Sequence, residues 1–121
     1  MKNKWDDNLF ENWLYLRNQL KAFKKDKNWL KVTVTCAEII QLDSKAKFIG
    51  IMVPIFYKES AIAYEKMNDF TNAINYYSLA KDGFIKHRNE NRLANANDWI
   101  QDIDRIEEKI AGLLSKESVV K

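Results

Sequence analysis

Residues that interrupt or terminate regular structure are scarce in this sequence. It holds one proline, one cysteine, one histidine and three glycines in 121 residues. Sandwiches and barrels need many tight turns, which glycine and proline usually form, so this shortage argues against an all-β fold. The length suits one domain with a single modest core. We therefore expect one all-α domain spanning residues 1–121.

The sequence also lacks a long apolar run. Its most apolar uncharged stretch, Phe48 to Tyr57, is about half of the roughly 20 residues that a membrane-spanning helix requires. The first residues carry charges where a signal peptide would have an apolar core, and the lone Cys36 has no partner for an intramolecular disulfide. We therefore expect a cytoplasmic protein that does not contact a membrane.

The net charge is small and unevenly distributed. Lysine and arginine number 20 against 17 acidic residues, which gives +3, far below the excess typical of a dedicated nucleic-acid binder. Residues 1–50 hold ten basic and six acidic side chains, whereas residues 51–121 hold ten and eleven. This asymmetry predicts a positive surface on the first half of the chain.

Apolar residues recur at helical spacing along most of the chain. Polar or helix-capping residues separate these amphipathic stripes, which predict about five antiparallel helices with short connections. The last six residues, 116–121, are expected to fray. The expected helices lie at about 9–23, 28–42, 48–67, 70–84 and 93–115.

Four residues bear on where these helices begin and how they pack. Ser44 and Asp69 are helix-capping types and are expected to cap the third and fourth helices. Pro54 either kinks the third helix or lets it restart, because proline lacks the amide donor and clashes with the preceding turn. Gly83 costs about 1 kcal/mol relative to alanine inside a helix, which indicates either close packing or an early end.

The stretch from Ala61 to Ala80, AIAYEKMNDFTNAINYYSLA, resembles a tetratricopeptide repeat, a hairpin of two helices about 34 residues long. If Pro54 is the first position, the repeat covers 54–87, and Ser60 and Ile85 depart from the pattern. The residues that fit it are Tyr57, Ala61, Tyr64, Ala73, Tyr77 and Ala80.

The resemblance implies a short array of stacked hairpins. A weaker copy can be laid over residues 13–46, with seven extra residues, 47–53, before the second copy. The helix at 93–115 would then cap the exposed end of the array. Because helical repeats usually need about three units for stability, so short an array must depend on its cap or on a partner.

Four cations on the first helix are the most specific functional signal. They stand at i, i+4, i+7 and i+8, which places them on one face of that helix. In tetratricopeptide arrays the equivalent positions line a concave groove. The cations are Arg17, Lys21, Lys24 and Lys25, and the resemblance adds Ile55, Lys58, Ile62 and Lys66 from the second repeat.

A groove lined in this way suits an acidic peptide or helix, because the cations steer it and the isoleucines bury its apolar side chains. The alternative interpretation of the four cations is an ordinary solvated helix face. Some members of the family grip C-terminal carboxylates with a lysine, asparagine and arginine set. Glu59 and Ile62 stand where that set would be polar or basic, so the sequence does not support such a clamp.

The sequence predicts no enzyme, no metal site and no cofactor. His87 lies between Lys86 and Arg88, which do not suit it to act as a base, and we interpret it as a solvated helix-end residue. Cys36 falls at an interior position and is expected to be a buried, inert thiol. One histidine and one cysteine are too few for a typical zinc site, and no glycine-rich phosphate loop is present.

We therefore expect a protein-interaction module whose partner is another protein or peptide with acidic character. One alternative is a homodimer, formed through the apolar run from Phe48 to Phe56 or through the terminal helix. A second alternative is weak, salt-dependent nucleic-acid binding through the four cations. Nucleic acid is the less favoured partner because no aromatic platform accompanies these cations.

Overall fold

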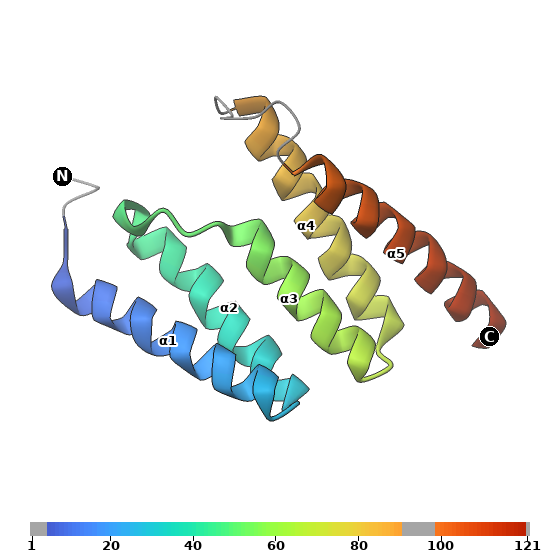
Figure 1. Cartoon of the computed structure of the whole chain (residues 1–121), viewed down its shortest axis with the longest axis horizontal. Coiled ribbons are helices and arrows are strands. Elements are labelled where there is room, and N and C mark those ends of the chain that lie inside the picture. The colour runs from blue at the N-terminus through green and yellow to red at the C-terminus, as the bar shows by residue number, and fades with distance from the viewer. Residues whose placement is uncertain (1–4, 91–98, 121) are drawn as a thin grey trace.

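The computed structural model of the chain describes residues 5–90 and 99–120 (Figure 1). Within these two ranges the protein is helical and contains no strand, which confirms the predicted all-α class. A short 3-10 helix, η1, joins the second and third α-helices. The elements are α1 (Asp7–Lys25), α2 (Trp29–Lys45), η1 (Lys47–Ile49), α3 (Val53–Lys66), α4 (Phe70–Glu90) and α5 (Ile100–Val120).

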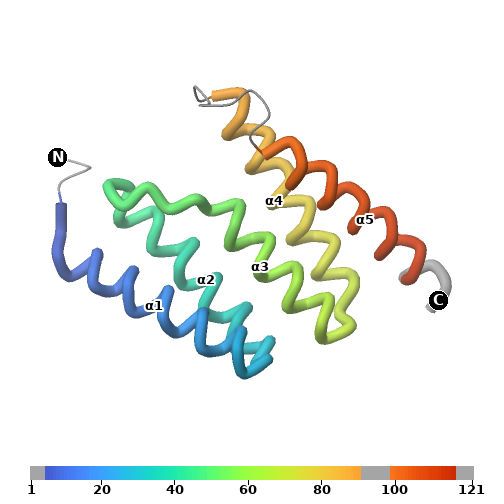
Figure 2. The backbone as a smooth tube through the Cα atoms, in the orientation of Figure 1, coloured from blue at the N-terminus to red at the C-terminus, as the bar shows by residue number. Residues whose placement is uncertain are grey.

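The five α-helices form a row in chain order, from α1 at one edge to α5 at the other (Figure 1). Each helix runs antiparallel to the one before it and packs chiefly against its neighbours in the chain. The α1–α2 and α3–α4 turns lie on one side of the row, at the same ends of the helices, whereas η1 lies at the opposite ends of the helices (Figure 2). Helices α1, α3 and α5 therefore point one way, and α2 and α4 point the other.

The α1–α2 and α3–α4 turns have the same conformation. Lys27 and Asn68 adopt the left-handed backbone region, with φ of 57° and 61°. The residue that follows each, Asn28 or Asp69, donates its backbone N–H to a carbonyl five residues earlier at 2.9 Å. The side chain of that residue then caps the next helix, which confirms the cap predicted at Asp69. Equivalent positions are 41 residues apart, the same offset as the two repeat copies.

Helix α2 is longer than the sequence indicated. It runs to Lys45, and Ser44 lies within it, so the prediction that Ser44 caps the third helix is wrong. The Ser44 hydroxyl instead donates a hydrogen bond to the backbone carbonyl of Gln41 at 2.7 Å, which a serine inside a helix can do. Helix α3 begins only at Val53, after Gly50 has ended η1 in the left-handed region with φ of 72°.

The third helix restarts at Pro54 rather than kinking there. Pro54 lies in the first turn of α3, where a missing amide donor costs no intrahelical hydrogen bond. Gly83 lies inside α4, which continues to Glu90, so Gly83 does not end that helix early.

Helix α5 corresponds to the predicted fifth helix but is displaced towards the C-terminus. Of the predicted range 93–115, residues 93–98 lie outside the described part of the chain. The helix continues to Val120, so the fraying expected for 116–121 is wrong over 116–120. None of the helices in the described ranges combines the length and apolarity needed to cross a membrane.

Two apolar clusters form the core, and α3 contributes to both. Alanines on opposite sides of α3 enter the two clusters, so this helix joins the halves of the row. The first cluster contains Leu16, Leu20, Val32, Cys36, Ile39, Leu42, Ala46, Ile51 and Ala63. The second contains Ala61, Ala73, Tyr77, Ala80, Phe84, Ile106 and Leu113.

Candidate functional site

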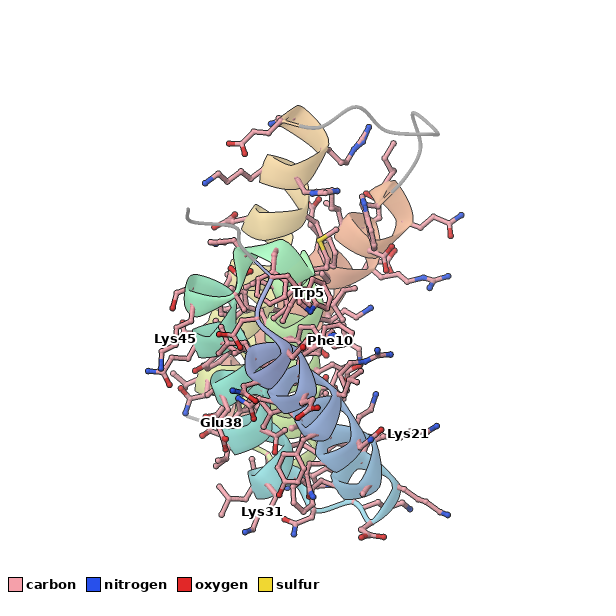
Figure 3. The ribbon with its side chains drawn as sticks, turned by 90° about the vertical axis from the view of Figure 1, so that its left-hand side faces the viewer. Trp5, Phe10, Lys21, Lys31, Glu38 and Lys45 are labelled. Carbon is pink, nitrogen blue, oxygen red and sulfur yellow. The ribbon has the colours of Figure 1, made fainter. Side chains whose placement is uncertain are left out.

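Charged side chains of α1, α3 and α5 meet on one face of the row, which we call the odd-helix face. Three ion pairs join α1 to α3 and α3 to α5, although these helices do not follow one another directly in the chain. The side chain of Lys21 lies on the side of the molecule opposite Glu38 and Lys45 of α2 (Figure 3). The pairs are Lys24 Nζ–Glu59 Oε2 at 2.9 Å, Lys58 Nζ–Asp102 Oδ1 at 3.5 Å and Lys109 Nζ–Glu65 Oε2 at 3.0 Å.

A hollow of about 220 Å³ lies between α1 and α3 on this face. Its charged wall comes from α1, and Lys24 also reaches across to Glu59 of α3. The apolar part of the lining comes from one side chain of each helix. We call it the α1–α3 hollow, and its lining residues are Arg17, Leu20, Lys21, Lys24 and Phe56.

A second hollow, of about 310 Å³, lies between α3 and α5, and we call it the α3–α5 hollow. Ile106 and Tyr77, each with 2% of its surface exposed, contribute to its lining. A neighbouring hollow of about 340 Å³ shares three of its residues and reaches Lys116 further along α5. The α3–α5 hollow is lined by Lys58, Ile62, Glu65, Lys66, Tyr77, Asp102, Arg105, Ile106 and Lys109.

Glu65 is held in place within the α3–α5 hollow by two donors. The Tyr77 hydroxyl donates to its Oε1 at 2.9 Å, and Lys109 Nζ donates to its Oε2 at 3.0 Å. Burial raises the pKa of Glu65, but the hydrogen bonds from Lys109 and Tyr77 outweigh burial and bring the pKa below its ordinary value. Burial, together with the Glu65 carboxylate, raises the pKa of Tyr77 well above its ordinary value. Glu65 is therefore a fixed anion at neutral pH.

The cations of the α3–α5 hollow fall into two classes. Lys58 and Lys109 are paired with carboxylates of the hollow itself. Lys66 and Arg105 line the same hollow, and neither forms an ion pair with another residue of the described ranges. Four cations against two carboxylates leave the hollow with a positive charge, and two of these cations are available to a ligand.

The structure distributes the eight predicted groove residues unevenly. Three of them line the α1–α3 hollow, and Lys58, Ile62 and Lys66 line the α3–α5 hollow. Ile55 is half-buried and packs against the second core cluster. Lys25 is exposed in the last turn of α1 and lines neither hollow.

Helix α5 contributes to this face, which its interpretation as a cap does not predict. Its residues Arg105, Lys109 and Lys116 line the hollows beside it. Their spacing of i, i+4 and i+11 places all three cations on one side of a helix, so the signal was present in the sequence. Helix α5 therefore both covers the second core cluster and supplies half of the α3–α5 hollow.

The residues singled out for possible chemistry occupy structural positions. Cys36 is fully buried, as predicted, and burial raises the pKa of its thiol to about 11, with a hydrogen bond to Ser60 offsetting part of the rise. His87 is half-buried and meets the Trp99 ring edge-on, with the ring centroids 6.2 Å apart. Within the described ranges, no three His, Cys, Asp or Glu side chains lie close enough to hold a metal ion.

Comparison of the chain with protein-family models, with curated proteins and with solved structures finds no match in any of the three. The resemblance to tetratricopeptide repeats therefore stays a prediction from the sequence. Charged and apolar side chains of three helices converge on hollows only at the odd-helix face among the surfaces described above, so this face is the candidate functional site.

Proposed function

We propose that the protein is a protein-interaction module that binds an acidic peptide or helix of another protein on the odd-helix face. The observation that carries this proposal is the pair of hollows on that face, which place cations of α1, α3 and α5 around apolar side chains. Cations attract an acidic segment and orient its approach, and the apolar lining gives its hydrophobic side chains a place to be buried.

The division of the face into separate hollows supports a peptide rather than one large organic ligand. Binding sites for small molecules commonly enclose about 300–1,000 Å³ and bury most of the ligand. The α1–α3 hollow, of about 220 Å³, is below this range, and α3 separates it from the α3–α5 hollow of about 310 Å³ and its neighbour of about 340 Å³. Such a series of hollows suits successive side chains of one segment.

The convergence of charge favours binding over a merely solvated surface. Cations of a solvated helix face point separately into water, whereas those of the odd-helix face come from three helices and gather around shared hollows. Three carboxylates partly neutralise them, yet Lys66 and Arg105 keep uncompensated charge where apolar surface is also present. Like charges held close together cost free energy unless a ligand compensates them.

The proposal includes the repeat interpretation of the chain. In this interpretation α1–α2 and α3–α4 are two tetratricopeptide-like hairpins, α5 is their cap, and the module works in the cytoplasm. The identical conformation of the two turns, 41 residues apart, supports the equivalence of the hairpins. It also supports the assignment of α1, α3 and α5 to one binding face, because equivalent helices of stacked repeats lie side by side.

Fluorescence anisotropy with a designed peptide tests the proposal. The probe is a fluorescein-labelled peptide of about fifteen residues, with both termini blocked and leucines flanked by glutamates at helical spacing. We expect the protein to bind it more tightly than a matched peptide that carries lysine in place of glutamate. Lys21→Glu combined with Arg105→Glu should weaken binding by more than about tenfold, because the change reverses one cation in each hollow.

The matched control reverses two cations outside these hollows. Lys45 in α2 and Lys86 in α4 are both exposed, and neither lines the hollows of the odd-helix face. Lys45→Glu combined with Lys86→Glu changes the net charge by the same amount and should leave peptide binding nearly intact. Equal loss in the two double variants would overturn the proposal, because it would mean that total charge rather than the odd-helix face attracts the peptide.

The same samples distinguish the alternative functions. Sedimentation at several protein concentrations detects a homodimer, and titration with duplex DNA at low and moderate salt detects nucleic-acid binding. A dimer that excludes the peptide, or DNA bound more tightly than the peptide at moderate salt, would replace the proposed function. A monomer that prefers the acidic peptide would support it.

A further inference from the structure

We infer that the α3–α5 hollow is the anchoring half of the odd-helix face and takes one apolar side chain flanked by two carboxylates, which Lys66 and Arg105 bind. This inference rests on the proposed function and names the segment of the partner that makes the main contact. The apolar side chain would lie against Ile62, Tyr77 and Ile106, and the flanking carboxylates would lie towards α3 and α5.

The extent of the two hollows favours α3–α5 as the anchor. Both have a floor that belongs to a buried core cluster, with Leu20 in the α1–α3 hollow and Tyr77 and Ile106 in the α3–α5 hollow. The α3–α5 hollow also continues along α5 into its neighbour of about 340 Å³. The α1–α3 hollow is smaller, with about 220 Å³. Contacts on a firmly packed, desolvated surface usually dominate binding, because little ordering is needed when the ligand arrives.

The internal ion pairs select which cations a ligand can use. A carboxylate of the partner that approached Lys109 would have to displace Glu65, which Tyr77 also holds. One that approached Lys58 would compete with Asp102, although that pair is longer, at 3.5 Å. Lys66 and Arg105 present no such competitor among the described residues, so within this hollow the carboxylates of a ligand go first to them.

Glu65 and Asp102 also determine what the centre of the hollow rejects. Both carboxylates line it beside the apolar side chains. An acidic side chain inserted at the centre would meet like charge, whereas an apolar side chain would not. The two residues therefore act as specificity determinants, because they require an apolar residue in the middle and allow acidic residues only at the flanks.

Single reversals of the two available cations test this assignment with the blocked, labelled peptide. We expect Lys66→Glu and Arg105→Glu each to weaken binding about tenfold, whereas Lys21→Glu in the α1–α3 hollow should weaken it about twofold. All three side chains are exposed, so thermal unfolding should be unchanged. For Arg105→Glu, a peptide with lysine in place of one flanking glutamate should restore binding, since the pair of charges is then exchanged.

Removing a carboxylate that competes with the ligand for a lysine should tighten binding instead of weakening it. Asp102→Asn frees Lys58 and should tighten binding of the acidic peptide about threefold. Asp82→Asn is the matched control, because Asp82 is exposed on α4, lines neither hollow and changes the net charge equally. Equal tightening in the two variants would overturn the role of Asp102.

The outcomes separate this inference from the proposed function. If Lys21→Glu removes binding and the reversals at Lys66 and Arg105 do not, the odd-helix face binds the peptide but its anchor is the α1–α3 hollow. If the protein does not distinguish the glutamate peptide from the lysine peptide, the proposed function fails and this inference fails with it. If decanoate displaces the peptide and Arg105→Glu weakens decanoate binding equally, the hollow takes a small amphipathic anion instead of a peptide.

Discussion

The ring of Pro54 in the first turn of α3 lies directly against Gly83 in α4. A Cβ atom added to Gly83 would lie 2.5 Å from Cγ and 3.1 Å from Cβ of the proline. Each residue is unfavourable in the interior of an isolated helix, proline because of its ring and glycine because of its backbone entropy. Together they allow the two helices to approach closely, since the ring fills the space that a side chain at position 83 would occupy.

We predict that Gly83→Ala destabilises the protein. Alanine gains about 1 kcal/mol of helix propensity over glycine, but overpacking a filled interface costs about 1–3 kcal/mol. The ring carbon of Pro54 cannot move away as the end of a flexible side chain would, so we expect the cost to exceed the gain by about 1 kcal/mol. Thermal unfolding followed by circular dichroism should show Tm lowered by roughly 4 °C.

Gly112→Ala is the matched control, because this glycine also lies inside a helix but has nothing within 4 Å of an added Cβ. It should gain about 0.5–1 kcal/mol of stability from helix propensity and lower unfolded-state entropy. In a Pro54→Ala background the penalty of Gly83→Ala should shrink. Tm shifts of the same sign for Gly83→Ala and Gly112→Ala would show that the contact with Pro54 does not exclude a side chain at position 83.

The positions of Pro54, Gly83 and Ser44 show where prediction of the fold from the sequence stops. The five helices could be predicted because each has its own apolar stripe, a local property of the sequence. For Pro54 and Gly83 the sequence left two alternatives each, and the contact between them is a property of two packed helices. Ser44 misled the prediction because a serine hydroxyl can cap the next helix or bond to a carbonyl of its own helix.

The candidate site also could be predicted only in part from the sequence. The cations of α1 could be predicted from their spacing, but at about 100° per residue Lys25 points about 40° beyond Lys21. It therefore lies outside the arc of α1 residues that line the α1–α3 hollow. The pairing of Lys24 with Glu59 depends on the distance between α1 and α3, and that of Lys58 with Asp102 on the distance between α3 and α5. The sequence does not determine these distances. Which cations a ligand can use followed only from the structure.

Tyr77→Phe tests the hydrogen bond that fixes Glu65. The variant keeps the buried ring in the second core cluster but removes the hydroxyl that donates to Glu65 at 2.9 Å. A hydrogen bond of this kind contributes about 1 kcal/mol, so urea unfolding should give a free energy of unfolding lower by about that amount. Tyr15→Phe, at a residue that is 59% exposed, should change it by less than about 0.5 kcal/mol. Equal effects would contradict the role of the hydroxyl.

The lowered pKa of Glu65 predicts a pH-dependent contribution to stability. Folding favours the ionised carboxylate, because Lys109 and Tyr77 donate to it, so the folded state binds the proton less tightly than the unfolded state. The stabilisation is therefore present above the ordinary glutamate pKa of 4.5 and is lost as the pH falls through the lower pKa of the folded state. Unfolding by urea from pH 7 down to about pH 3 measures this loss.

Glu65→Gln provides the reference for that titration. Glutamine accepts a hydrogen bond but does not ionise in this range, so the variant should be less stable than the wild type at pH 7. The difference should narrow as the pH falls through the lowered pKa of the folded state, where the wild-type carboxylate becomes protonated. A difference that stays constant from pH 7 to pH 3 would mean that the charge of Glu65 does not contribute.

Cys36 should report on opening of the first core cluster. The thiol is fully buried among α1, α2 and α3, and burial raises its pKa to about 11, so at pH 8 it is both protonated and shielded from reagents. We expect iodoacetamide to label the Cys36 thiol only as the protein unfolds in urea. Mass spectrometry measures the labelled fraction. A Cys36→Ala variant with Ala37→Cys moves the thiol to an exposed neighbouring position of α2 and should react in the native state. Rapid labelling of native wild-type protein would contradict the closed packing of α1 against α2, on which the α1–α3 hollow depends.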